Sequence, residues 1–164
     1  MNNTTVTEDL LRTASRFWLM KSEPGECSDA LAAPGRRVSW FGIRNYQARN
    51  FMRDDMTIGD AVLFYHSSCA KPGIAGIARI ASDVYPDELQ FDPESEYYDP
   101  KSTKENPRWL TLDVEALFKC PVVEIGRLRE EPELAGMRVL QKGNRLSITP
   151  VEKEEFAFIV RNLL

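Results

Sequence analysis

The ordered part of this chain begins with the apolar run FWLMKS at residues 17–22, which the breaker EPG follows at residues 23–25. Six mostly apolar residues ended by a proline and a glycine are typical of a buried β-strand. Pro24 restricts the residue before it to extended geometry. The segment therefore predicts a buried strand whose last side chains point into a turn.

Further strand signals follow along the chain. Residues 57–60 predict a turn that leads into AVLFYH at residues 61–66, a second run of strand length. Further strands are predicted over residues 74–84, 108–117 and 144–149. Gly73 and Gly76 suggest a bulge or a close backbone approach in the first of these. There is no regular alternation of strand and helix, which favours an α+β domain built on a small, curved, mostly antiparallel sheet or barrel flanked by short helices.

The remaining segments predict one folded unit with a loose start. Residues 1–16 are polar and lack a clear period, so they are expected to form a flexible leader, and residues 17–164 a single domain. Asn45 is a helix cap for residues 46–54, and Pro150 is expected to start a terminal helix. Residues 86–107 form a long acidic stretch whose prolines and tyrosines predict an ordered, packed loop.

Composition narrows the class of protein. The net charge of −4 argues against indiscriminate binding to polyanions. No run approaches the roughly 18 apolar residues of a membrane helix, and no signal peptide precedes residue 17, so a cytoplasmic protein with no membrane partner is expected. Three widely spaced cysteines and one histidine supply no zinc pattern, so we expect no metal and no cofactor.

Enzyme signatures are weak. The chain contains no phosphate-binding glycine loop, no HExxH and no GxSxG motif. A catalytic serine or cysteine would have to use His66, and a sole histidine in an apolar strand is more often a packed structural residue than a general base. We therefore predict a domain that is not catalytic.

Binding signatures are stronger and centre on Trp40. Five arginines and no acid lie between residues 34 and 53, and residues 137–147 form a second segment rich in basic residues and free of acids. Aromatic rings stack on bases and arginines hold phosphates. Trp40 can also be ordinary core, since most tryptophans of small domains are largely buried.

Several motifs in these segments resemble one family. FWLMKSEP at residues 17–24 resembles the opening YWLMKSEP of EVE domains, and WFGIRNYQARN at residues 40–50 resembles their WxGVRNYQARN. GDAVLFYHS at residues 59–67 and PGIAGIA at residues 72–78 continue the resemblance. It extends from about Phe17 to the C-terminus.

This resemblance implies a PUA-like fold related to YTH and ASCH domains, and a nucleic-acid partner. EVE domains are thought to recognise modified bases, with modified cytosine in DNA favoured. The implied base site comprises Lys21, Ser22, Glu23, Trp40, Arg44, Asn45, Ser67, Tyr98 and Trp109, and the implied phosphate contacts are Arg49 and Arg145.

The resulting hypothesis is a reader that flips a base into an aromatic pocket, with Trp40 as the stacking wall. An RNA-binding module, for instance for tRNA, is one alternative, and an ASCH-like enzyme acting on small molecules or RNA is another. No effector domain is recognised, so any output such as restriction or repair is expected to come from partner proteins.

Overall fold

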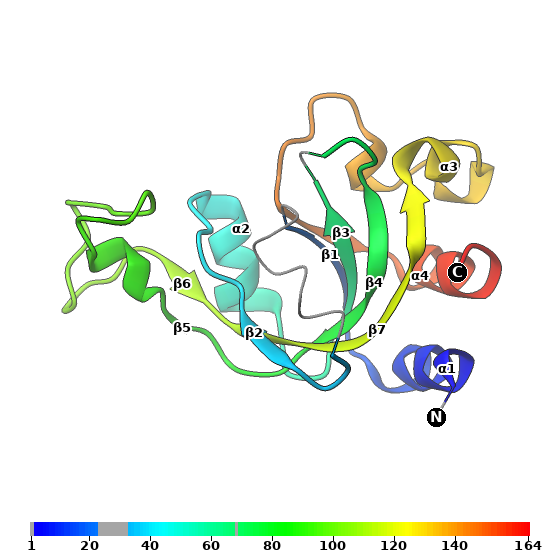
Figure 1. The fold of residues 1–164 in the computed structure, drawn as a ribbon, viewed down its shortest axis with the longest axis horizontal. Helices are drawn as coiled ribbons and strands as arrows, with labels where there is room; N and C mark the ends of the chain where they lie inside the picture. The colour runs from blue at the N-terminus through cyan, green and yellow to red at the C-terminus, as the bar shows by residue number, and fades with distance from the viewer. Residues whose placement is uncertain (1, 23–32, 68) are drawn as a thin grey trace.

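A computed structural model of the protein describes residues 2–22, 33–67 and 69–164. Its centre is a curved six-stranded sheet in the order β2-β7-β4-β3-β1-β8 (Figure 1). The strands are β1 (Phe17–Ser22), β2 (Arg37–Ser39), β3 (Ala61–His66), β4 (Gly73–Ile80), β7 (Asp113–Glu124) and β8 (Ile148–Val151). Only β1 and β3 pair in parallel, and all other pairs in this sheet are antiparallel. The predicted fold class is confirmed.

The two faces of the sheet carry separate apolar clusters. One face holds Leu19 and Leu63, and it is covered by the helices α1 (Asn3–Thr13), α3 (Ile125–Arg129) and α4 (Lys153–Asn162). The other, here the Trp40 face, holds Met20, Phe64 and Trp40. Helix α2 (Tyr46–Asn50) and the π-helical turn Phe51–Asp55 pack on this second face. Residue alternation along β1 and β3 thus supplies both clusters.

The N-terminal segment is not the loose leader that its polarity suggested. Asn2 caps helix α1, because its Oδ1 accepts a hydrogen bond from Thr5 N at 2.8 Å. Leu10 and Leu11 are each 5% exposed, and they join the core cluster that also contains residues of β1 and α4. Two buried leucines in an otherwise polar helix were too weak a periodic signal to predict it.

The C-terminal boundary also differs from the prediction. Pro150 lies inside β8, which is the edge of the sheet, and α4 begins only at Lys153. A proline is tolerated there because an edge strand does not need every N–H for its ladder. The helix starts with a capping box in which Glu152 N donates to Glu155 Oε1 at 2.9 Å.

The glycines of β4 behave as predicted. The pairing register shifts between Ile74 and Gly76, which marks a bulge. A Cβ on Gly73 would lie 2.2 Å from the carbonyl oxygen of Val123, so only glycine lets β4 approach β7 this closely.

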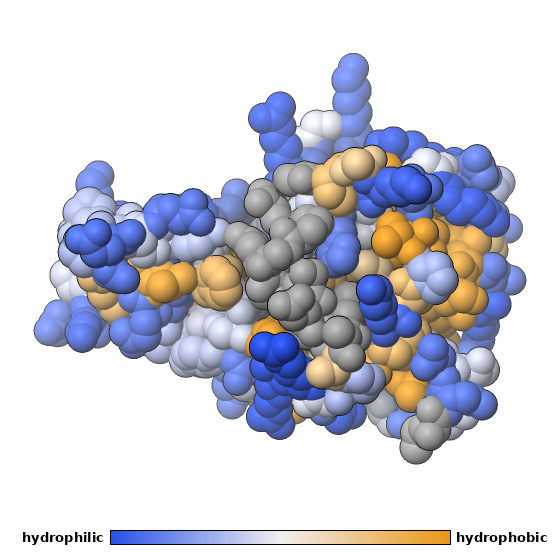
Figure 2. Space-filling model, viewed as in Figure 1, coloured by the Kyte–Doolittle hydropathy of each residue, from blue (hydrophilic) through white to orange (hydrophobic). Residues whose placement is uncertain are grey.

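Residues 85–111 form an arm that projects from the sheet (Figure 1). Its base is the short pair β5 (Tyr85–Pro86) and β6 (Leu110–Thr111), and Glu88–Phe91 is a 3-10 helix. Buried Gln90 ties both ends together, since its Nε2 donates to the carbonyl oxygens of Asp87 and Trp109, each at 2.8 Å. The arm stands away from the body with hydrophilic residues over most of its outline (Figure 2). The prediction of an ordered, packed loop is confirmed.

Candidate nucleic-acid interface

The ends of β1 and β3 bring predicted site residues together. Because the two strands are parallel, their C-terminal ends lie side by side at one end of the sheet, and Ser22 pairs with His66. Ser67 N donates to the carbonyl oxygen of Ser22 at 3.0 Å, and Lys21 N donates to that of Ser147 at 2.8 Å. The basic segment at residues 137–147 therefore reaches this strand end through Ser147.

Trp40 lies deep beside this strand end. It is 3% exposed and belongs to the core cluster of its face. Its ring meets Phe64 edge-on with centroids 5.1 Å apart, and Phe64 meets His66 edge-on at 5.8 Å. Trp40 is thus core in this structure and is connected to the strand end through one further ring.

Lys21 and Ser22 point to opposite faces of the sheet. The ammonium of Lys21 lies 5.9 Å from the ring centroid of Tyr65, which belongs to the Leu19 side of the core. Burial of Lys21 lowers the pKa of its ammonium. Ser22 is 4% exposed and shares its face with Met20 and Trp40. Of this pair, Ser22 alone lies on the Trp40 face.

His66 lies at the same strand end, and the predicted site did not include it. Its Nε2 is buried and has no hydrogen-bond partner among the described residues. Burial, and then the charge of Lys119, lowers the pKa of the imidazole, so it is neutral at pH 7. The sequence had marked His66 only as a weak catalytic candidate.

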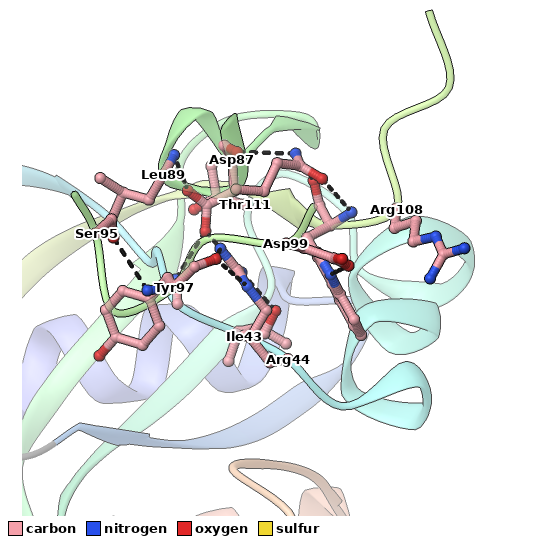
Figure 3. Close-up of polar contacts among 12 residues, drawn as sticks. Ile43, Arg44, Asp87, Leu89, Ser95, Tyr97, Asp99, Arg108 and Thr111 are labelled. Carbon is pink, nitrogen blue, oxygen red and sulfur yellow. Dashed lines mark hydrogen bonds and ion pairs between the residues drawn. The ribbon is translucent and has the colours of Figure 1, made fainter. Parts of the chain in front are cut away.

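The side chain of Arg44 binds two residues of the arm, Asp87 and Tyr97 (Figure 3). Its Nη1 pairs with Asp87 Oδ2 at 3.0 Å, and its Nε and Nη2 donate to the carbonyl oxygen of Tyr97 at 3.1 and 2.9 Å. Its guanidinium also lies over the rings of Tyr97 and Trp109, at 5.5 and 5.6 Å from their centroids. Gly42 N donates to the same Asp87 oxygen at 2.8 Å. Arg44 therefore joins the arm to the segment after Trp40.

Arg49 and Asn45 are likewise engaged, around α2. Asn45 caps the helix as predicted, with its Oδ1 accepting from Ala48 N at 3.0 Å. Arg49 donates to Asn50 Oδ1 and to the carbonyl oxygen of Arg108, and it stacks 4.7 Å from the ring centroid of Tyr46. These contacts join α2 to the arm.

Trp109 and Tyr98 belong to the arm. Trp109 is 6% exposed, donates from Nε1 to Asp99 Oδ2 at 2.8 Å and packs 4.8 Å from the ring of Tyr46. Tyr98 is 41% exposed. Within residues 33–67 and 69–164, the hydrogen bonds and ring contacts of these two residues do not extend to His66. The predicted site residues thus form two separate groups. Arg44, Asn45, Arg49, Tyr98 and Trp109 lie at the arm and α2, whereas Lys21, Ser22 and Ser67 lie at the strand end. Glu23 lies outside the described residues.

A different set of cations is available to a ligand. Within the two acid-free segments that the sequence marked, five exposed basic side chains form no ion pair with the described residues, namely Arg36, Arg37, Arg138, Lys142 and Arg145. Two belong to the first segment and three to the second. No helix among the described residues is long and apolar enough to cross a membrane, and no group of three potential metal ligands occurs among them.

A family model of the EVE domain matches residues 16–162. The chain belongs to the EVE domain family. Thymocyte nuclear protein 1 of Homo sapiens is 38% identical over 176 residues, which cover 96% of this chain and 78% of that protein. Neither the family nor this relative is named for an enzymatic activity. The name of this relative says nuclear, and the cytoplasmic location stays a prediction.

Solved structures agree with the family and with the fold. A Pseudomonas putida EVE relative has a TM-score of 0.81 and 47% identity, covering 88% of this chain and 97% of that one. Human THYN1 in complex with DNA containing 5-methylcytosine has a TM-score of 0.81 and 38% identity, covering 90% and 96%. An ASCH protein of Zymomonas mobilis has a TM-score of 0.54 at 10% identity over 90% of this chain, a likeness of fold alone.

Proposed function

We propose that this protein binds DNA and reads a modified cytosine that is flipped out of the duplex to the strand-end site of β1 and β3. The observation that carries the proposal is the human relative, whose structure is a complex with 5-methylcytosine DNA and which matches nearly the whole of this chain. The polar strand end formed by buried Ser22 with half-buried His66 and Ser67, next to the rings of Phe64 and Trp40, supports it.

The physical requirement for reading a base explains these features. A base must leave the stack to present its whole edge, which costs a few kcal/mol, and the site must offset this with ring contacts and edge hydrogen bonds. Ser22 and Ser67 bring hydroxyl groups to this strand end, which adjoins the buried rings of Phe64 and Trp40. Discriminating one methyl is worth only about 1–3 kcal/mol, so we expect modest selectivity.

The engaged arginines change the assignment of phosphate contacts. Arg49 and Arg44 position the arm and α2. Arg145 and Lys142 are exposed, and they belong to the segment whose Ser147 accepts a hydrogen bond from Lys21 at the strand end. We assign Arg36, Arg37, Lys142 and Arg145 to phosphates. Tyr98, an exposed aromatic of the arm, and Asn45 remain proposed contacts to the DNA beside the flipped base.

We expect short labelled duplexes with 5-methylcytosine or 5-hydroxymethylcytosine to bind several-fold more tightly than the unmodified duplex, as measured by fluorescence anisotropy. Ser22→Ala should weaken binding of the modified duplex by roughly 2- to 10-fold, the usual range for one hydrogen bond. Trp40→Ala is a poor test, because truncating a buried tryptophan costs about 3–5 kcal/mol of stability by itself.

Ser15→Ala is the matched control, since exposed Ser15 precedes the other end of β1. Equal binding of all three duplexes would contradict the proposal. Tighter binding to the same sequence as RNA, lost when the 2′-hydroxyls are removed, would instead favour the RNA-binding alternative.

Removing assigned phosphate contacts should reduce the salt dependence of binding. Each neutralised phosphate contributes about −0.9 to the slope of log affinity against log salt. The double variant Lys142→Met, Arg145→Met should therefore lose nearly 2 from that slope, with equal loss on modified and unmodified DNA. Arg127→Met on α3, whose partner is Glu131, is the control and should keep the slope. An unchanged slope in the double variant would refute the assignment.

A further inference from the structure

His66 lies beside two glycines on the Trp40 face. It alternates with Phe64 along β3, so both side chains lie on that face. The neighbouring strand β4 places Gly73 opposite His66 and Gly76 opposite Phe64. Neither glycine has a side chain that could shield the imidazole from that direction. Among the described residues, β4 therefore places no side chain next to the imidazole on this face.

The buried Nε2 of His66 has no hydrogen-bond donor among the described residues. A buried polar atom without a partner is uncommon in a folded protein, and an orphaned N–H is rarer and more costly than an orphaned lone pair. The neutral imidazole carries one proton, so that proton belongs on Nδ1 and the lone pair on the buried Nε2. Nε2 is thus prepared to accept a hydrogen bond.

Burial and one neighbouring charge keep the imidazole neutral. Burial is the larger cause of its lowered pKa, and the charge of Lys119 on β7 is the second. Glu124, also on β7, is exposed and is paired with Gly73 of β4, the residue that lies opposite His66. Lys21 on β1 lies near Tyr65, on the other face. At pH 7 the lone pair of Nε2 is therefore present.

We propose that His66 Nε2 accepts a hydrogen bond from the exocyclic amino group of the flipped cytosine, which makes His66 the residue that separates cytosine-type bases from thymine. This inference rests on the proposed function. Cytosine presents an amino donor where thymine presents a carbonyl acceptor, and the two bases can carry the same 5-methyl group. With thymine, two acceptors would face each other in a buried site, and neither would be paired.

The test compares duplexes in which guanine faces either 5-methylcytosine or thymine. A mismatched thymine flips more easily than a paired base, so flipping alone would favour thymine. We expect the wild-type protein to prefer 5-methylcytosine by about tenfold, the upper range of one hydrogen bond. His66→Leu should erase or invert this preference, and His66→Gln, whose amide oxygen can accept, should restore part of it. Thermal unfolding of each variant checks that the fold is retained.

Acid pH supplies a second readout that a purely structural histidine would not give. Protonation of His66 turns Nε2 into a donor. As the pH falls from neutral to below the lowered pKa of the imidazole, binding of 5-methylcytosine should weaken and binding of thymine should strengthen. His66→Leu should show neither change.

The outcomes separate the two proposals. If wild-type protein prefers 5-methylcytosine to cytosine but His66→Leu still rejects thymine, the role of His66 is refuted and the proposed function stands. If wild-type protein shows no preference for 5-methylcytosine over cytosine, the proposed function fails and the assignment of His66 fails with it.

Discussion

Asp60→Ala is expected to lower the free energy of unfolding by about 3–5 kcal/mol, because it leaves the buried indole N–H of Trp18 and three partly buried donors without their acceptor. Asp60 is fully buried. Its carboxylate accepts from Trp18 Nε1 at 3.0 Å, from Thr57 N at 3.0 Å, from Thr57 Oγ1 at 2.9 Å and from Arg16 N at 3.3 Å. One side chain thus fixes the start of β1, the turn before β3 and a core tryptophan.

Urea unfolding followed by tryptophan fluorescence measures this loss, and the shift of the midpoint should occur without a change of slope. Asp60→Asn should lose much of the same stability, because its amide nitrogen would face donors where an oxygen now accepts. Asp54→Ala is the control, since Asp54 is exposed and bonds only Arg53 among the described residues, and it should change stability by less than about 0.5 kcal/mol. A similar small loss for Asp60→Ala would contradict the structural role.

The role of Asp60 shows where the sequence stops being informative. Residues 57–60 were predicted as a turn, and they are one. The hydrogen bond to Trp18 joins residues 42 positions apart, and no local pattern encodes such a contact. In contrast, the strands at residues 17–22 and 61–66 were predicted with their observed bounds, because breakers flank short continuous apolar runs.

The residues of the candidate site also fall into those whose placement a local pattern indicates and those whose placement depends on distant contacts. That Lys21 and Ser22 face opposite sides follows from the two-residue period of a strand, so the sequence could have indicated it. That Asn45 caps α2 was predicted from its position. The pairing of Arg44 with Asp87, 43 residues away, was not predictable, and it turns a proposed ligand contact into a support for the arm. Resemblance to a family gives the segments of a site, whereas the tertiary contacts give the task of each side chain.

Arg44→Met is expected to destabilise the protein by about 2–4 kcal/mol, because breaking a largely buried pair by removing one partner leaves the other charge uncompensated. Asp87 is 2% exposed and Arg44 21% exposed, so little water can replace the lost guanidinium. The variant also loses the hydrogen bonds to the carbonyl oxygen of Tyr97 that hold the arm. Thermal unfolding measures the stability, and amide hydrogen exchange should show faster exchange over residues 85–111.

Arg145→Met is the matched comparison, because it removes the same charge from an exposed side chain without an ion pair in the described residues. It should keep the unfolding temperature and lose about 0.9 from the salt slope of DNA binding. Arg44→Met should lower the unfolding temperature and, measured at a temperature where it is folded, keep the salt slope. If Arg44→Met instead loses slope without losing stability, Arg44 meets a phosphate, and its contacts to Asp87 and Tyr97 must open when DNA binds. The two measurements on two arginines therefore decide whether the arm is a fixed part of the binding surface or is released by the ligand.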